Sequence, residues 1–239
     1  MTSITVIKLG TRVAQTHLSM IAQQLRDLHD GNPGGFVIVS SGAVSSGMRV
    51  LRWTDRPADL ASKQACAAIG QPLLMQTWST SLSPVQAAQV LVTHEDILHE
   101  TTNIRNTILR LLEIGVIPII NENDTVSTTE LAIGDNDQLG ARVARILGAG
   151  MYIIYSSIPG LLDKRNQVIP EVGEITADTR ALVKDAFDAH SVGGMRTKLL
   201  AAELCLQDGI PVFIGSPNEP ILSVLGRTAM GTLFHNKKK

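Results

Sequence analysis

The stretch VIPIINEND at residues 116–124 begins with an apolar run and ends in carboxylates and amides. The run at 116–120 is too short for a helix, so it predicts a buried strand whose end carries polar groups. Similar β-branched runs predict further strands at 4–7, 36–39, 89–92, 151–155, 211–214 and 232–234.

Apolar residues recur at helical spacing between these runs. The expected helices cover 18–28, 61–78, 104–112 and 139–147, and Gly31, Gly115 and Gly148 fit helix ends. Pro72 should kink or split the second helix. Buried strands that alternate with helices predict an α/β protein with a mainly parallel sheet covered on both faces. Such sheets bind ligands at the carboxyl ends of their strands.

Composition restricts the class of protein further. With 239 residues, 44% of them hydrophobic, the chain is expected to form a sizeable core and not to be disordered. A net charge of -1 gives no global attraction to nucleic acid or to a membrane surface. Cys66 and Cys205 lie among apolar residues and are expected in the core. No signal peptide or membrane span is read, so we expect a cytoplasmic protein, with Lys237–Lys239 as a solvated tail.

Two strand ends are candidates for anion binding. Lys8 ends the first strand, where it either meets an anion or extends to solvent at the sheet edge. Residues 40–47, SSGAVSSG, form either a tight turn or a loop whose N–H groups reach a phosphate or carboxylate. The loop is not a Walker A motif, because Met48 and Arg49 stand where Lys and Ser/Thr are required.

Carboxylates and amides are dense in two short segments, 121–124 and 134–137. An amino acid would suit them, since carboxylates can receive an ammonium group and amides can serve a carboxylate. The alternatives are a surface loop, a plain helix cap at Asp135, or a metal site made by Glu122, Asp124, Asp135 and Asp137. Magnesium usually binds through substrate phosphates, which makes direct protein ligands less apt.

A second glycine and lysine segment, 193–198, precedes another helix. It is either a further anion site or a helix start with an exposed lysine. Two such sites around an acidic cluster suggest phosphoryl transfer from a nucleotide to an acceptor. His94 is expected to begin a helix rather than act as a base, and no histidine pairs with a cysteine as a zinc site would require.

The combination of segments resembles the glutamate 5-kinases, a branch of the amino acid kinase family. The segments are VIKLGT (6–11), VSSGAVSSG (39–47), KQACAAIGQPLLMQ (63–76), PIINENDTVSTTELAIGDND (118–137), GGMRTK (193–198) and GTLFH (231–235). The resemblance implies a three-layer αβα sandwich in a single domain, 1–239, without a PUA domain. It implies a glutamate-binding half, about 1–148, and an ATP-binding half, about 149–239. The implied reaction is ATP-dependent phosphorylation of the γ-carboxylate of L-glutamate to L-glutamyl 5-phosphate, the first step of proline biosynthesis.

The resemblance also assigns site residues. Lys8, Asp137 and Lys198 match catalytic positions, with Asp137 organising the two lysines, and Ser41, Asp124 and Asn136 match glutamate-binding positions. The implied ATP-binding residues are Lys8, Ser156, Ser157, Val192, Gly193, Gly194, Met195, Arg196, Thr197 and Lys198. Ser156 and Ser157 replace a usual Thr-Asp pair, and Val192 replaces a usual threonine. The implied cofactors are ATP and Mg²⁺, the latter bound through ATP phosphates without a direct protein ligand.

Elementary chemistry fits this reading. A glutamate side chain, with a pKa of about 4.3, is already an anion at neutral pH and needs no general base. The lysines would offset repulsion between two anions, and the acyl phosphate product requires protection from water. The resemblance further implies a homo-oligomer, proline feedback and handover to a glutamyl phosphate reductase. The alternatives are another amino acid kinase or an amino-acid-binding regulator that has lost catalysis.

Overall fold

The computed structural model describes residues 3–31, 34–127, 136–183 and 194–236. Within them the strands are β1 (Thr5–Leu9), β2 (Phe36–Val39), β3 (Gln86–Val92), β4 (Val116–Glu122), β5 (Met151–Tyr155), β6 (Glu171–Val172), β7 (Val212–Gly215) and β8 (Gly231–Phe234). They form one 8-stranded sheet in the order β3-β4-β2-β1-β5-β7-β8-β6. Every neighbouring pair is parallel except β7 and β8. The predicted mainly parallel sheet is confirmed.

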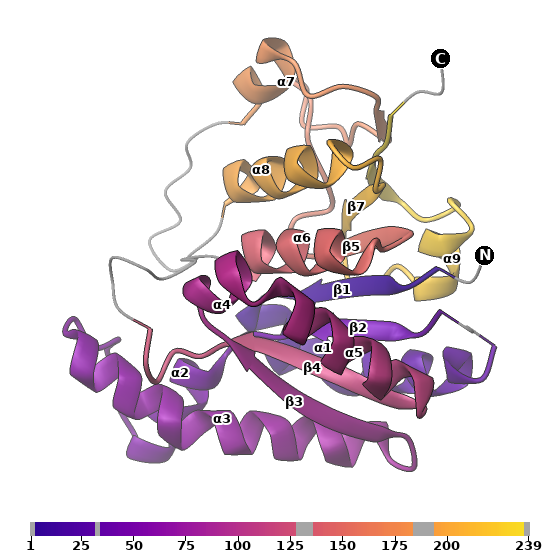
Figure 1. Cartoon of the computed structure of the whole chain (residues 1–239). Helices are drawn as coiled ribbons and strands as arrows, with labels where there is room; N and C mark the ends of the chain where they lie inside the picture. Colours follow the sequence, from indigo (N-terminus) through magenta and orange to yellow (C-terminus); the bar gives the residue numbers. More distant parts are fainter. Residues whose placement is uncertain (1–2, 32–33, 128–135, 184–193, 237–239) are drawn as a thin grey trace.

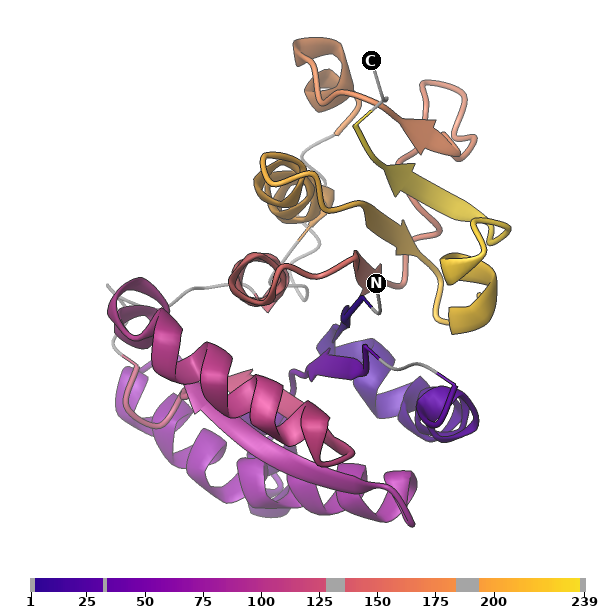
Figure 2. The ribbon, with the colours of Figure 1, turned by 45° about the vertical axis from the view of Figure 1, so that its right-hand side comes forward.

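Helices cover both faces of this sheet, which makes three layers (Figures 1 and 2). They are α1 (Thr11–His29), α2 (Ala43–Leu51), α3 (Leu60–Leu82), α4 (His94–His99), α5 (Thr101–Glu113), α6 (Asn136–Leu147), α7 (Ala177–Ala181), α8 (Met195–Leu206) and α9 (Ile221–Leu225). Buried residues of α4, α5, α6 and α8 share one core with the sheet, and those of α1, α3 and α9 share the other. The αβα sandwich is therefore confirmed.

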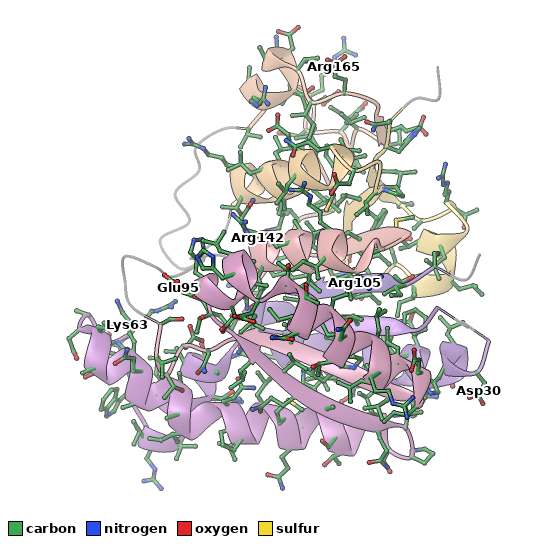
Figure 3. The ribbon with its side chains drawn as sticks, viewed as in Figure 1. Asp30, Lys63, Glu95, Arg105, Arg142 and Arg165 are labelled. Atoms are coloured by element: carbon green, nitrogen blue, oxygen red, sulfur yellow. The ribbon has the colours of Figure 1, made fainter. Side chains whose placement is uncertain are left out.

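Strand β1 illustrates why both faces are apolar. Val6 belongs to the core under α6, whereas Ile7 and Leu9 belong to the core under α1, and all three are fully buried. Successive side chains point to opposite faces, so a strand between two helical layers is apolar throughout. In contrast, Asp30, Arg105 and Arg165 lie exposed on the outside (Figure 3).

The strand predictions hold, with small changes at the ends. Strand β3 begins three residues earlier than expected, and β4 continues through Asn121 and Glu122 because these residues pair with the end of β3. The short elements β6, α7 and α9 were not predicted, since two to five residues carry too little periodicity.

Of the two outcomes expected at Pro72, a kink or a split, the split is wrong, because α3 continues through this residue. Pro72 cannot donate an N–H to the carbonyl of Ala68, but both residues are exposed, so water can take the place of the missing donor. Two other expectations are confirmed: Cys66 and Cys205 are buried, and His94 begins α4.

No helix in the described ranges is both long enough and apolar enough to cross a bilayer. The expectations for Asp135, Val192, Gly193 and the Lys237–Lys239 tail fall outside the described residues.

Candidate active site

The candidate site lies where parallel strands β4, β2, β1 and β5 end side by side. Lys8 stands near the end of β1, Ser40 and Ser41 follow β2, and Asn121 and Glu122 end β4. Gly42 then adopts a left-handed φ of 112°, which glycine tolerates best, and turns the chain into α2. The first turn of α6 meets these strand ends.

Asp137 is the electrostatic centre of the site. Its side chain is 0% exposed, and its two carboxylate oxygens pair with different lysines. Oδ1 pairs with Lys8, and Oδ2 lies 2.8 Å from the Nζ atom of Lys198. Burial alone would raise the pKa of Asp137, but the charges of Lys8 and Lys198 outweigh it and hold that pKa below its usual range. Asp137 is therefore held in its ionised form between the two lysines.

Neighbouring groups fix Asp137 further. The Thr197 hydroxyl donates to its Oδ2 atom at 3.1 Å, and the Tyr152 hydroxyl donates to its backbone carbonyl at 2.9 Å. Gly140 lets Tyr152 approach α6, because a Cβ atom there would collide with the phenol. The expected role of Asp137 as organiser of the two lysines fits this geometry.

The amino end of α8 lies beside the same carboxylate. Gly194 precedes the helix, and among the described residues no side chain caps it. A Cβ atom on Gly194 would meet no described atom within 4 Å, so space remains in front of the first turn. The first N–H groups of a helix, with a lysine such as Lys198 nearby, can bind the oxygens of a phosphate.

Asn136 lies next to Asp137 and contacts the ends of β2 and β4. Its Nδ2 atom lies 2.6 Å from the Ser41 hydroxyl, 2.7 Å from the Ser40 carbonyl and 3.0 Å from Oδ1 of Asn121. The structure thus brings together Ser41 and Asn136, two of the three residues expected to bind glutamate.

Asp124 lies two residues beyond the end of β4. Burial, and to a lesser extent the charge of Glu122, raise the pKa of Asp124 to about 6, although Arg56 opposes them. Glu122 is itself buried and accepts a hydrogen bond from Ser127 at 3.2 Å. A further positive charge beside Asp124, such as that of an ammonium ligand, would favour the ionised form of Asp124.

The structure describes only some of the residues that are expected to bind the nucleotide. Ser156 is buried after β5, where its N–H donates to Gly215 at 2.9 Å. Ser157, Gly194 and Arg196 are exposed, and Met195 is half-buried in the first turn of α8.

Sequence reasoning missed Gln71 and Trp78 of α3. Gln71 accepts from Asn121 at 2.9 Å, and Trp78 donates to the Ser40 hydroxyl at 3.0 Å. The available signal was a glutamine inside an apolar helix, since a buried amide requires partners.

The fold and the paired lysines define an α/β protein suited to phosphoryl transfer between small molecules. The chain belongs to the amino acid kinase family, whose sequence pattern matches residues 3–216. It is 41% identical over 217 residues to the glutamate 5-kinase of Thermus thermophilus, covering 85% of this chain and 58% of that protein. It is 40% identical over 247 residues to that of Meiothermus ruber, covering 96% and 65%. The chain thus spans about six tenths of the length of these relatives.

A further relative is closer in length. The chain is 38% identical over 232 residues to the glutamate 5-kinase of Clostridium acetobutylicum, covering 92% of this chain and 86% of that protein. Among solved structures, N-acetylglutamate synthase from Neisseria gonorrhoeae matches with a TM-score of 0.73 and 14% identity, over 99% of this chain and 60% of that one. Carbamate kinase from Giardia lamblia matches with a TM-score of 0.68 and 15% identity, over 98% and 99%. These structures support the fold alone.

Proposed function

We propose that the chain transfers the γ-phosphoryl group of ATP to the γ-carboxylate of L-glutamate. The products are ADP and L-glutamyl 5-phosphate, and the reaction is the first step of proline biosynthesis. The observation that carries the proposal is the buried Lys8–Asp137–Lys198 cluster, with Asn136 directly before Asp137 in the first turn of α6. The relatives named glutamate 5-kinase support the choice of substrate.

The cluster would act by electrostatics. Two ammonium groups and one carboxylate leave one net positive charge in a buried place. That charge attracts the phosphate oxygens and offsets the repulsion between two anionic reactants. The donor set at Lys8, Lys198 and the start of α8 fits a triphosphate, and Mg²⁺ bound through that triphosphate supplies further positive charge. Because the acceptor carboxylate is ionised at neutral pH, no side chain must remove a proton.

The amino acid would be bound by three residues, Ser41, Asp124 and Asn136. Asp124, whose ionised form lacks sufficient compensation, would receive the ammonium group. The Ser41 hydroxyl would donate to a substrate carboxylate, and the Oδ1 atom of Asn136, whose N–H groups face Ser40 and Asn121, would accept from the ammonium group. The γ-carboxylate would then lie toward the two lysines, because Asp137, which pairs with both of them, directly follows Asn136 in α6.

Several finer features belong to this proposal. Residues 1–148 would form the glutamate-binding half and 149–239 the ATP-binding half, with Ser156, Ser157 and residues 192–198 at the nucleotide. The substitutions at Ser156 and Ser157 would change contacts to the nucleoside rather than to the transferred group. A homo-oligomer, a cytoplasmic location, proline feedback and handover to a reductase complete the expected picture.

An ADP-release assay with L-glutamate, L-aspartate and N-acetyl-L-glutamate tests the proposal. We expect turnover with L-glutamate, and hydroxylamine should trap the product as the γ-hydroxamate. Preference for another acceptor would assign the chain to a different amino acid kinase. Calorimetric binding of glutamate without ADP release would favour the regulator that has lost catalysis.

A further inference from the structure

The side-chain amide of Asn136 has more acceptors around it than it can use at once. An amide carries two N–H donors, yet the Ser40 carbonyl, the Ser41 hydroxyl and Oδ1 of Asn121 all lie within 3.0 Å of Nδ2. A hydroxyl can rotate away to meet a ligand, whereas the other two acceptors are a backbone group and a buried amide. Ser40 and Asn121 are therefore the partners that can hold Asn136 in place.

Asn121 is itself oriented by helix α3. Its Nδ2 atom donates to Oε1 of Gln71 at 2.9 Å, and Gln71 donates onward to Gln89 at 3.2 Å. Asn121 and Gln71 are buried, and Gln89 is exposed on the edge strand β3. The Gln71 oxygen fixes which end of the Asn121 amide faces Asn136, because a reversed amide would set two donors against each other.

Ser40 is held by the same helix. The indole Nε1 atom of Trp78 donates to the Ser40 hydroxyl at 3.0 Å, and both residues are 0% exposed. The Ser40 N–H donates to the carbonyl of Ile120 at 2.8 Å, which fixes the backbone from the other side. The carbonyl that receives Asn136 is thus fixed on two sides.

Gln71 and Trp78 are seven residues apart, so two helical turns bring them to the same face of α3. From Gln64 to Leu82 the helix contains no charged residue, so these two side chains supply much of the polarity that its buried face offers. A buried glutamine without partners costs stability, and here the side-chain oxygen of Gln71 accepts from Asn121, which contacts the site residue Asn136. Two separate arms therefore run from α3 to the Asn136 amide. One runs from Gln71 through Asn121, and the other runs from Trp78 through Ser40.

We infer that Gln71 and Trp78 are positioning residues for acceptor binding, and that they act through Asn121 and Ser40 on Asn136. The inference rests on the proposed function for the identity of the acceptor, L-glutamate. Neither residue touches the acceptor itself. Loss of either arm should weaken glutamate binding while leaving nucleotide binding and the lysine pair intact.

The first test compares Gln71→Leu with Gln76→Leu, an exposed glutamine on the same helix. We expect Gln71→Leu to raise the KM for glutamate about 5- to 20-fold, the effect of a lost neutral hydrogen bond, with the KM for ATP within twofold. Gln76→Leu should leave both values unchanged. An unchanged glutamate KM in folded Gln71→Leu protein, or an equal rise for ATP, would overturn the inference.

A double-mutant cycle tests whether Gln71 acts through Asn136. In an Asn136→Ala background, adding Gln71→Leu should change the glutamate KM by less than twofold. A full additional 5- to 20-fold loss would show another route and overturn the inference. Trp78→Phe, which removes the N–H donor and keeps an aromatic ring, is the second variant should Gln71→Leu not fold. It should also raise the glutamate KM, and an unchanged value in folded protein would overturn the second arm.

A readout without turnover separates this inference from the proposed function. The Asn136 side-chain amide signal in a ¹⁵N NMR spectrum can be assigned by its loss in Asn136→Asp. It should move or broaden in ligand-free Gln71→Leu and stay in place in Gln76→Leu. If wild-type protein releases no ADP with glutamate, the proposed function fails, yet this signal still tests the positioning. A signal at the wild-type position in Gln71→Leu would contradict it.

Discussion

Lys8, Asp137 and Lys198 are charged residues that are almost fully removed from water. Such burial is costly unless each charge finds a partner of opposite sign, and Asp137 provides one partner for two lysines. The three groups together carry one net positive charge, which we propose attracts an anionic ligand.

Replacing Lys198 with alanine tests the residue at this centre. We expect kcat to fall about 10²- to 10³-fold, because one donor to the developing charge is lost, with a much smaller change in the KM for glutamate. Lys164→Ala, at an exposed lysine, is the control and should keep wild-type kinetics. A rate for Lys198→Ala within threefold of wild type would refute the assignment.

The raised pKa of Asp124 predicts a pH dependence of substrate binding. Burial raises this pKa to about 6, so below that pH the carboxyl group is protonated and cannot pair with an ammonium group. The glutamate KM should rise about tenfold per pH unit below about 6 and level off above it. Steady-state kinetics of Asp124→Asn should show a high KM without this break, and a break that persists would assign it to another group.

The raised pKa of Asp124 also affects the stability of the folded protein. The unfolded carboxyl group loses its proton near pH 4, whereas the folded one loses it near 6. Ionisation therefore destabilises the folded state progressively as the pH rises from about 4 to about 6. Asp124→Asn should match wild type below that window and exceed it above by up to roughly 3 kcal/mol in urea unfolding. Equal stability at pH 7 would show that Asp124 is not buried as a charge.

At the level of elements, α2 and α3 pack through glycine. A Cβ atom on Gly70 would collide with the carbonyl of Ala43, and one on Gly47 would collide with that of Cys66. Helix propensity alone predicts that Gly70→Ala stabilises the protein by about 1 kcal/mol. The collision reverses the sign, since overpacking typically costs about 1–3 kcal/mol.

Thermal and urea unfolding of Gly70→Ala check this prediction. Ala68→Gly, at an exposed site on the same helix, should lose only about 1 kcal/mol through propensity. If Gly70→Ala is more stable than wild type, the two helices separate readily, and α3 is a weaker support for Asn136 than its contacts indicate.

The elements that were predictable are those with a strong local signal. The runs at 116–120 and 151–155 are apolar because both sheet faces are covered, and they became β4 and β5. The antiparallel pairing of β8 with β7 depends on contacts between distant segments, and local periodicity carries no information about it. Likewise, residues 86–88 lack the β-branched signal and are strand through pairing with β4.

The candidate site was predictable to a similar extent. The motifs identified Lys8, Asp137 and Lys198. These side chains come into contact only because β1, α6 and α8 meet in the folded chain. Trp78 reads as an ordinary core residue, so its hydrogen bond to Ser40 was invisible in the sequence. Supporting contacts are harder to predict than binding groups, because they require only a partner and no particular motif.

For the whole molecule, the central position of β1 and β5 joins the two proposed ligand-binding halves. Lys8 and Asp137 come from residues 1–148, and Lys198 comes from residues 149–239, so the charged cluster spans the division. A ligand that binds only the folded state raises its stability by about 2.7 kcal/mol at 100 times its Kd. For a chain of this size that amounts to a Tm increase of about 5–10 °C.

These shifts can be measured separately for the two ligands. A non-hydrolysable ATP analogue with Mg²⁺ should raise the Tm of wild type and of Asp124→Ala alike, and should raise that of Lys198→Ala much less. Glutamate should raise the Tm of wild type and fail to raise that of Asp124→Ala, because its ammonium group has lost its partner. If Asp124→Ala lost both shifts equally, Asp124 would support the whole site rather than bind the acceptor, and the division into two ligand-binding halves would have to be abandoned.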